Sequence, residues 1–161
     1  MIGSLRSLLM TWVTLGLALC LQAMPLPDAW LIWRPDWLGL MLIYWCLVAP
    51  QRVGVFHGFV LGLLIDLVEG APLGQNALVL SLLAYLALLL YSRMRAYALI
   101  QQAVLVFVLL GIAQLVEQWL RTIFGPFAIN LAFLLPALIG GILWPWLFTL
   151  LQMLRRRIGV S

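Results

Sequence analysis

Residues 97–119 read YALIQQAVLVFVLLGIAQLVEQW, a stretch in which apolar side chains follow one another without an alternation of period two. A continuously apolar stretch of this length predicts a membrane-spanning helix, because a bilayer core of about 30 Å needs roughly 20 helical residues. A strand of a membrane barrel would be shorter and would alternate. The stretch therefore predicts an all-α integral membrane protein.

The rest of the chain is also strongly hydrophobic. Of its 161 residues, 66% are hydrophobic and 9% are charged, whereas a soluble domain has about 45–50% apolar and about 25% charged residues. The mean hydropathy is +1.15. Proline, glycine and arginine separate six apolar blocks, which we expect to form the transmembrane helices of one polytopic domain over residues 1–161. The blocks lie at about residues 5–24, 35–49, 52–70, 74–91, 97–119 and 130–154.

All basic residues are arginine, and their placement predicts the orientation of the chain. With six crossings, seven of the nine arginines lie on the side of the amino terminus, which predicts cytoplasmic termini by the positive-inside rule. The block at 35–49 is short, because its 15 residues span only about 22 Å as a helix. If this block dips into the membrane and returns, seven arginines again lie on the cytoplasmic side. The number of arginines therefore does not decide whether the block crosses the membrane. Aromatic residues at both ends of the block favour six crossings.

The block at 52–70 carries small residues at a spacing of four, with a carboxylate on the same stripe. Such a stripe lets helix backbones approach closely in a membrane. It predicts either a seam with another helix of this chain or a groove for a transmembrane helix of another protein, and the two are compatible. The candidate packing and partner-binding residues are Gly54, Gly58, Gly62, Asp66 and Gly70.

Asp66 lies about one turn from the expected outer end of its helix, where it suits a hydrogen-bonding or helix-end role, an ion or proton pathway, or contact with a partner. Five further residues are secondary candidates, and two of them, Glu69 and Gly74, lie near Asp66 in the sequence. In the last block, Pro145 removes a helix hydrogen bond, and the tryptophans on either side of it point in different directions, toward lipid or toward a partner. These tryptophans are Trp144 and Trp146.

The chain lacks the residue sets that catalysis needs. It has one histidine, two cysteines in separate blocks, and no HExxH, GxSxG or GxxxxGK motif. We therefore expect no enzyme, no catalytic or metal-binding residues and no cofactor. The pI near 9.7 reflects the arginines that set the orientation of the chain in the membrane. We expect no nucleic-acid partner, because little of the chain is left outside the membrane to bind phosphates.

Several segments, taken in order, resemble the family of the rod shape-determining membrane protein MreD. The resemblance implies a bacterial inner-membrane protein of the machinery that builds the side wall of rod-shaped cells. It implies MreC as a direct partner, with MreB and with RodA and its transpeptidase in the same complex, among membrane lipids. The segments are Pro35-Asp36-Trp37, Leu42-Ile43-Tyr44-Trp45, Ala49-Pro50-Gln51-Arg52-Val53-Gly54, GFVLGLLIDLVEGAPLG at 58–74 and LWPWLF at 143–148.

The function implied by the resemblance is that of a non-catalytic scaffold, which binds MreC and so regulates side-wall peptidoglycan synthesis. The family is also similar to the six-helix substrate-binding components of vitamin (ECF-type) transporters. The alternative function is a subunit that binds or transports a small molecule or a lipid-linked precursor. That role needs a polar pocket among the helices, and the available polar residues are few: His57, Asp66, Gln75, Asn76, Ser81, Gln114 and Asn130.

Overall fold

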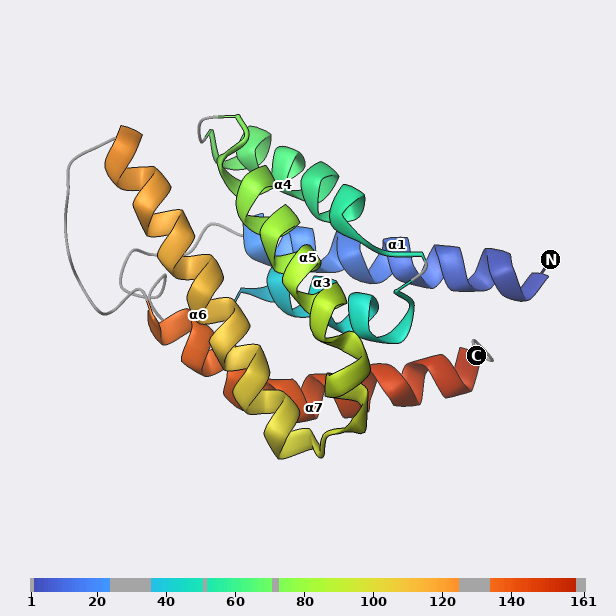
Figure 1. The fold of residues 1–161 in the computed structure, drawn as a ribbon. Coiled ribbons are helices and arrows are strands. Elements are labelled where there is room, and N and C mark those ends of the chain that lie inside the picture. Colours follow the sequence, from blue (N-terminus) through green and yellow to red (C-terminus); the bar gives the residue numbers. More distant parts are fainter. Residues whose placement is uncertain (1, 24–35, 51, 71–72, 125–133, 159–161) are drawn as a thin grey trace.

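The structure is a computed structural model that describes residues 2–23, 36–50, 52–70, 73–124 and 134–158. All regular secondary structure in these ranges is helical, which confirms the all-α part of the expected fold class (Figure 1). The elements are α1 (Ile2–Ala23), α3 (Trp37–Val48), α4 (Val55–Glu69), α5 (Gln75–Ala96), α6 (Leu99–Phe124) and α7 (Leu135–Ile158).

Within the described ranges, four helices are long and apolar enough to cross a membrane, namely α1, α5, α6 and α7. Helices α5 and α7 continue beyond the expected ends at residues 91 and 154, because their arginines lie in the last helical turn. Cations are favourable there, next to the negative end of the helix dipole. Residues 24, 35 and 130–133, which the expected helices included, lie outside the described residues.

The two shorter helices are α3, with 12 residues, and α4, with 15 residues. At 1.5 Å per residue they are about 18 and 22 Å long, less than the thickness of a bilayer core. Helix α3 is buried along almost all of its length, from Leu38 to Leu47. A helix that is apolar all round belongs in the interior of a protein. The short second block is therefore the central helix of the bundle.

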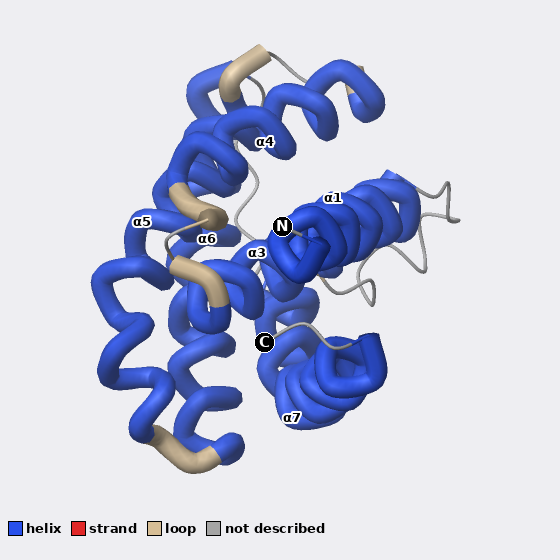
Figure 2. Tube along the Cα trace, turned by 90° about the vertical axis from the view of Figure 1, so that its right-hand side faces the viewer, coloured by secondary structure: helices blue, strands red, loops and turns tan. Residues whose placement is uncertain are grey.

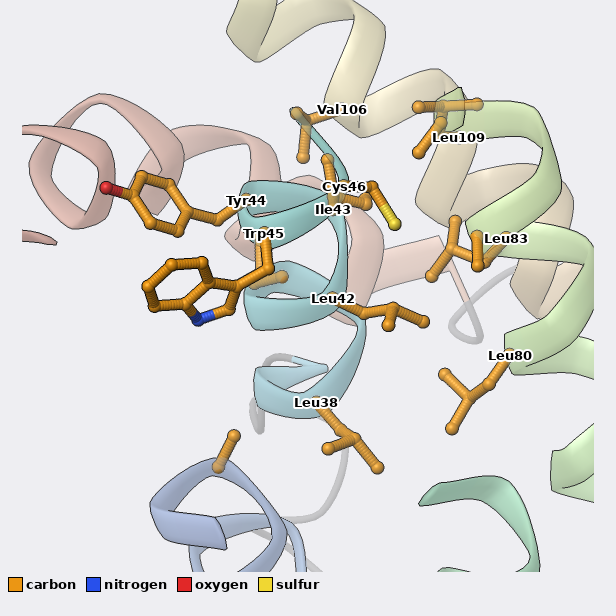
Figure 3. Close-up of a cluster of buried hydrophobic side chains, with 14 of the residues drawn as sticks. Leu38, Leu42, Ile43, Tyr44, Trp45, Cys46, Leu80, Leu83, Val106 and Leu109 are labelled. Carbon is orange, nitrogen blue, oxygen red and sulfur yellow. The ribbon is translucent and has the colours of Figure 1, made fainter. Parts of the chain in front are cut away.

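Figure 3 shows how α3 fills the centre. Leu42 and Ile43 extend from it among side chains of α5 and α6, such as Leu83 and Val106, while the ring of Tyr44 extends to another side. The helix is also fixed to α1 by polar contacts. Trp45 Nε1 donates to Thr14 Oγ1 over 2.8 Å, and the amide of Trp37, at the other end of α3, donates to Gln22 Oε1. Helices α1 and α3 therefore run antiparallel.

One end of the bundle collects most of the arginines, and we call it the arginine end. Arg52, just before α4, donates to Ser7 Oγ near the start of α1, and Arg95, at the end of α5, donates to the carbonyl of Val48 at the end of α3. The start of α1 and the end of α7 lie on the same side of the bundle (Figures 1 and 2). The arginine end therefore contains the start of α1 and the ends of α3 and α5.

Candidate functional site

The glycine stripe of α4 faces α5 in the same chain. A Cβ atom added at Gly62 would lie 2.3 Å from Ala77 Cα, and one added at Gly58 would lie 2.6 Å from the carbonyl oxygen of Leu80. Both contacts are with backbone atoms, which cannot move aside as a flexible side chain can. At Gly58 and Gly62 the stripe therefore packs against another helix of this chain, and we call this contact the α4–α5 seam.

Gly54, Gly70 and Gly74 do not make such a close backbone contact with another helix. At Gly54, the N-cap of α4, an added Cβ would meet only the end of the Leu88 side chain at 3.4 Å. Gly70 has φ +70° at the C-cap of α4, and Gly74 has φ +99° at the N-cap of α5. Both glycines are in the left-handed conformation, in which a side chain is strained.

Asp66 is the polar centre of the seam and is 1% exposed. Its Oδ2 accepts from the amide of Gly74 over 2.9 Å, and its Oδ1 accepts from the amide and the Nδ2 of Asn76 over 3.0 and 2.9 Å. These amides lie at the start of α5, where no residue inside the helix can satisfy them. Gly74 has no side chain with which to cap the helix. Asp66 therefore supplies the cap of α5 from the neighbouring helix, where a carboxylate also complements the helix dipole.

The α5 half of the seam was not predicted from the sequence. Ala77 and Ala84 are fully buried, and Ser81 turns its hydroxyl to its own helix by donating to the Ala77 carbonyl over 2.6 Å. Residues 77, 81 and 84 have the helical spacing of one face. Small side chains on this face let α5 approach the glycines of α4. The helical spacing of these small residues could have indicated the packing face of α5 from the sequence, but the many leucines around them make the pattern hard to see.

The other candidate residues lie apart from the α4–α5 seam. Glu69 is exposed at the end of α4. On α7, Trp144 is buried and donates from Nε1 to Gln102 Oε1 over 3.3 Å, whereas Trp146 is 75% exposed. Pro145 lies between them inside the helix. Helix α7 packs mainly against α6, so these residues do not share a site with Asp66.

Several described polar residues of the rival ligand-binding hypothesis have structural partners. His57 accepts from the Gly54 amide over 3.4 Å and packs against the Trp12 ring of α1, with 5.5 Å between ring centres. Asn76 is held by Asp66, as described above. Asn130 lies outside the described residues. His57, Asp66 and Asn76 therefore serve helix ends and helix packing.

The fold and the seam define a class: an all-helical, multi-pass membrane protein in which small residues hold two neighbouring helices together. The family model for the rod shape-determining protein MreD matches residues 3–154. The chain is also 36% identical over 146 residues to the rod shape-determining protein MreD of Haemophilus influenzae, which covers 88% of each chain. No solved structure matches. The chain belongs to the MreD family of rod shape-determining proteins.

Proposed function

We propose that this protein is a non-catalytic scaffold of the bacterial inner membrane that binds MreC and thereby regulates side-wall peptidoglycan synthesis. The observation that carries the proposal is the match to the MreD family along residues 3–154. In this role, MreB and RodA with its transpeptidase belong to the same complex. The protein acts by binding and positioning MreC.

The exposed aromatic side chains on the outside of the bundle support a scaffold role, because they are available to partner proteins. The glycine stripe is covered by α5 at Gly58 and Gly62, so a transmembrane partner binds elsewhere. Large aromatic side chains project from three other surfaces: Phe56 of α4 and Trp119 of α6 are each 74% exposed, and Trp146 of α7 is 75% exposed. Aromatic residues contribute much of the binding energy at protein interfaces. We place MreC against one of these surfaces.

The proposed topology has six crossings with both termini in the cytoplasm. It is supported by the antiparallel run of α1 and α3 and by the arginine end, which the positive-inside rule assigns to the cytoplasm. Helix α3 crosses although it is short, because protein rather than lipid surrounds it and satisfies its ends. For example, its first turn is capped by Asp36, which accepts from the amide of Gly39 over 3.1 Å.

Native mass spectrometry of the protein, extracted gently from its own membrane after mild crosslinking, tests the scaffold role. We expect MreC to be recovered with the wild-type protein. Replacing Gly62 by leucine should abolish recovery together with folding, whereas Gly16→Ala, with no atom within 4 Å of the added Cβ, should retain it. A stoichiometric small molecule without MreC would overturn the proposal in favour of a binding or transport subunit.

A further inference from the structure

A cavity of about 300 Å³ lies at the arginine end, between the ends of α3 and α5, the start of α6 and the last turns of α7. A volume of this size is at the lower end of the range of about 300–1,000 Å³ for small-ligand pockets. Most of its surface is polar, unlike an apolar groove between α6 and α7 and another along α7. Its lining residues are Leu47, Val48, Arg95, Gln102, Phe148, Gln152 and Arg155.

Two guanidinium groups from different helices converge on this cavity. Arg95 is held at its rim by donation to the Val48 carbonyl over 3.3 Å. Arg155 donates from one terminal nitrogen to Gln152 Oε1 over 3.2 Å. Gln102 is 4% exposed and fixes the wall, because its Nε2 donates to the Met94 carbonyl over 2.7 Å while its Oε1 accepts from Trp144. The charged groups are therefore positioned by neutral partners.

No carboxylate from the described part of the chain neutralises these two charges. The four acidic residues there lie toward the other end of the bundle: at the N-cap of α3, late in α4 and late in α6. They are Asp36, Asp66, Glu69 and Glu117. Arginine favours a planar partner that accepts two parallel hydrogen bonds, such as carboxylate or phosphate. With the described acidic residues elsewhere, no carboxylate within the described ranges compensates the positive charge of the cavity.

One buried polar atom beside the cavity also lacks a partner. Among the described residues, Arg155 Nε donates no hydrogen bond. Tyr44 is fully buried, its hydroxyl lies next to the Arg155 side chain, and its ring packs edge-on against Phe148 in the cavity wall. Figure 3 shows its hydroxyl directed away from α3. Buried polar groups are usually satisfied, so an unpaired donor points to a missing acceptor.

We propose that this cavity binds a phosphate group, held between the guanidinium groups of Arg95 and Arg155. Phosphate accepts bidentate hydrogen bonds from arginine and supplies the negative charge that the cavity lacks. The position between helices at the cytoplasmic end suits the headgroup of an anionic phospholipid, for which basic pockets between membrane helices are known sites. A soluble phosphomonoester has the same chemistry. The inference is independent of MreC binding.

The test measures binding to the purified full-length protein in nanodiscs of phosphatidylcholine with increasing phosphatidylglycerol. A parallel arm adds glycerol phosphate to nanodiscs of phosphatidylcholine alone. Retained molecules are counted by native mass spectrometry, and the melting temperature is followed in the same samples. We expect one saturable site, in one of the two arms, with a rise in melting temperature as it fills. The arm that saturates identifies the source of the phosphate.

Substitutions locate the site. Arg155→Gln and Arg95→Gln should each weaken binding at least about tenfold, because each removes a charge-assisted hydrogen-bond donor. Arg155→Lys, which keeps the charge but loses the planar fork, should weaken it less. The matched controls are Arg156→Gln and Arg157→Gln, which remove the same charge from exposed side chains outside the lining.

Equal binding by Arg95→Gln, Arg155→Gln and the two controls would overturn the proposal, as would the absence of a saturable site in both arms. If Arg155→Gln fails to fold, the same comparison is made with Arg95→Gln, whose side chain is exposed at the rim. Weakening that is equal in all four variants would show a diffuse charge effect and would also overturn it.

Discussion

At the scale of single residues, the α4–α5 seam depends on two chemical requirements. Gly62 must lack a Cβ because the backbone of α5 occupies that space, and Asp66 must present two carboxylate oxygens because three donors converge on it. Both requirements are structural, and both act on the same pair of helices. A substitution at either position should therefore loosen α5 against α4 before it affects any other contact.

Gly62→Ala tests the close approach with the smallest change. The added methyl group would lie 2.3 Å from Ala77 Cα, so the two helices must separate, and overpacking of this kind costs roughly 1–3 kcal/mol. The melting temperature of the purified protein in mild detergent should fall. Gly54→Ala, with 3.4 Å of clearance, should change it little. Equal melting temperatures for the two variants would show that the seam is looser than described.

Asp66→Asn tests the cap of α5. One oxygen becomes an NH₂ group that faces an N–H donor, and an unsatisfied buried donor costs about 1–3 kcal/mol. Faster hydrogen exchange at the amides of Gly74 and Asn76 should accompany the loss of stability. The control is Glu69→Gln, which removes a charge from an exposed side chain and should leave hydrogen exchange at these two amides unchanged. Unchanged exchange at both amides would contradict the cap.

At the scale of helices, α3 shows why a short apolar block can occupy the centre of a membrane protein. Its side chains are buried around the whole circumference, so its interactions are with other helices on every side. Helix α6 is different, since large apolar residues such as Val104 and Leu115 are more than half exposed. Truncating a side chain should therefore have unequal effects in these two helices.

Leu42→Ala in α3 should destabilise the protein by about 2–5 kcal/mol, because it leaves a cavity among buried side chains. Leu115→Ala in α6, where the leucine is 53% exposed, should cost much less. Thermal unfolding of both variants under identical detergent conditions gives the comparison. A similar loss in both would mean that α3 is not more deeply buried than α6.

Local spacing explains which elements could be predicted from the sequence. The apolar blocks and the stripe from Gly58 to Asp66 depend on neighbours three or four residues apart, so they are visible in the chain. The partner of the stripe depends on the tertiary structure, so the sequence left two alternatives open: another helix of this chain or a transmembrane helix of another protein. The partners of Asp66 are mostly backbone amides, which leave no trace in the sequence. The cavity could not be predicted either, because Arg95 and Arg155 belong to helices far apart in the chain.

At the scale of the whole molecule, the proposed topology assigns the arginine end to the cytoplasm. Cysteine labelling checks this after Cys20 and Cys46 have been replaced by serine. A membrane-impermeant maleimide added outside the inner membrane should label Leu73→Cys, in the connection between α4 and α5, and should not label Tyr97→Cys, between α5 and α6. Both side chains are exposed. The reverse pattern would invert the topology.

The scaffold role is the central claim, and it requires MreC to touch an outer surface of this protein. Photocrosslinking in living cells measures that contact, with a benzophenone side chain placed at Phe56, Trp119 or Trp146 in turn. The control is the same side chain at Trp144, which is buried two residues from Trp146. We predict an MreC adduct from at least one of the three exposed positions and none from Trp144. Normal protein levels without any MreC adduct from the three exposed positions would contradict the account.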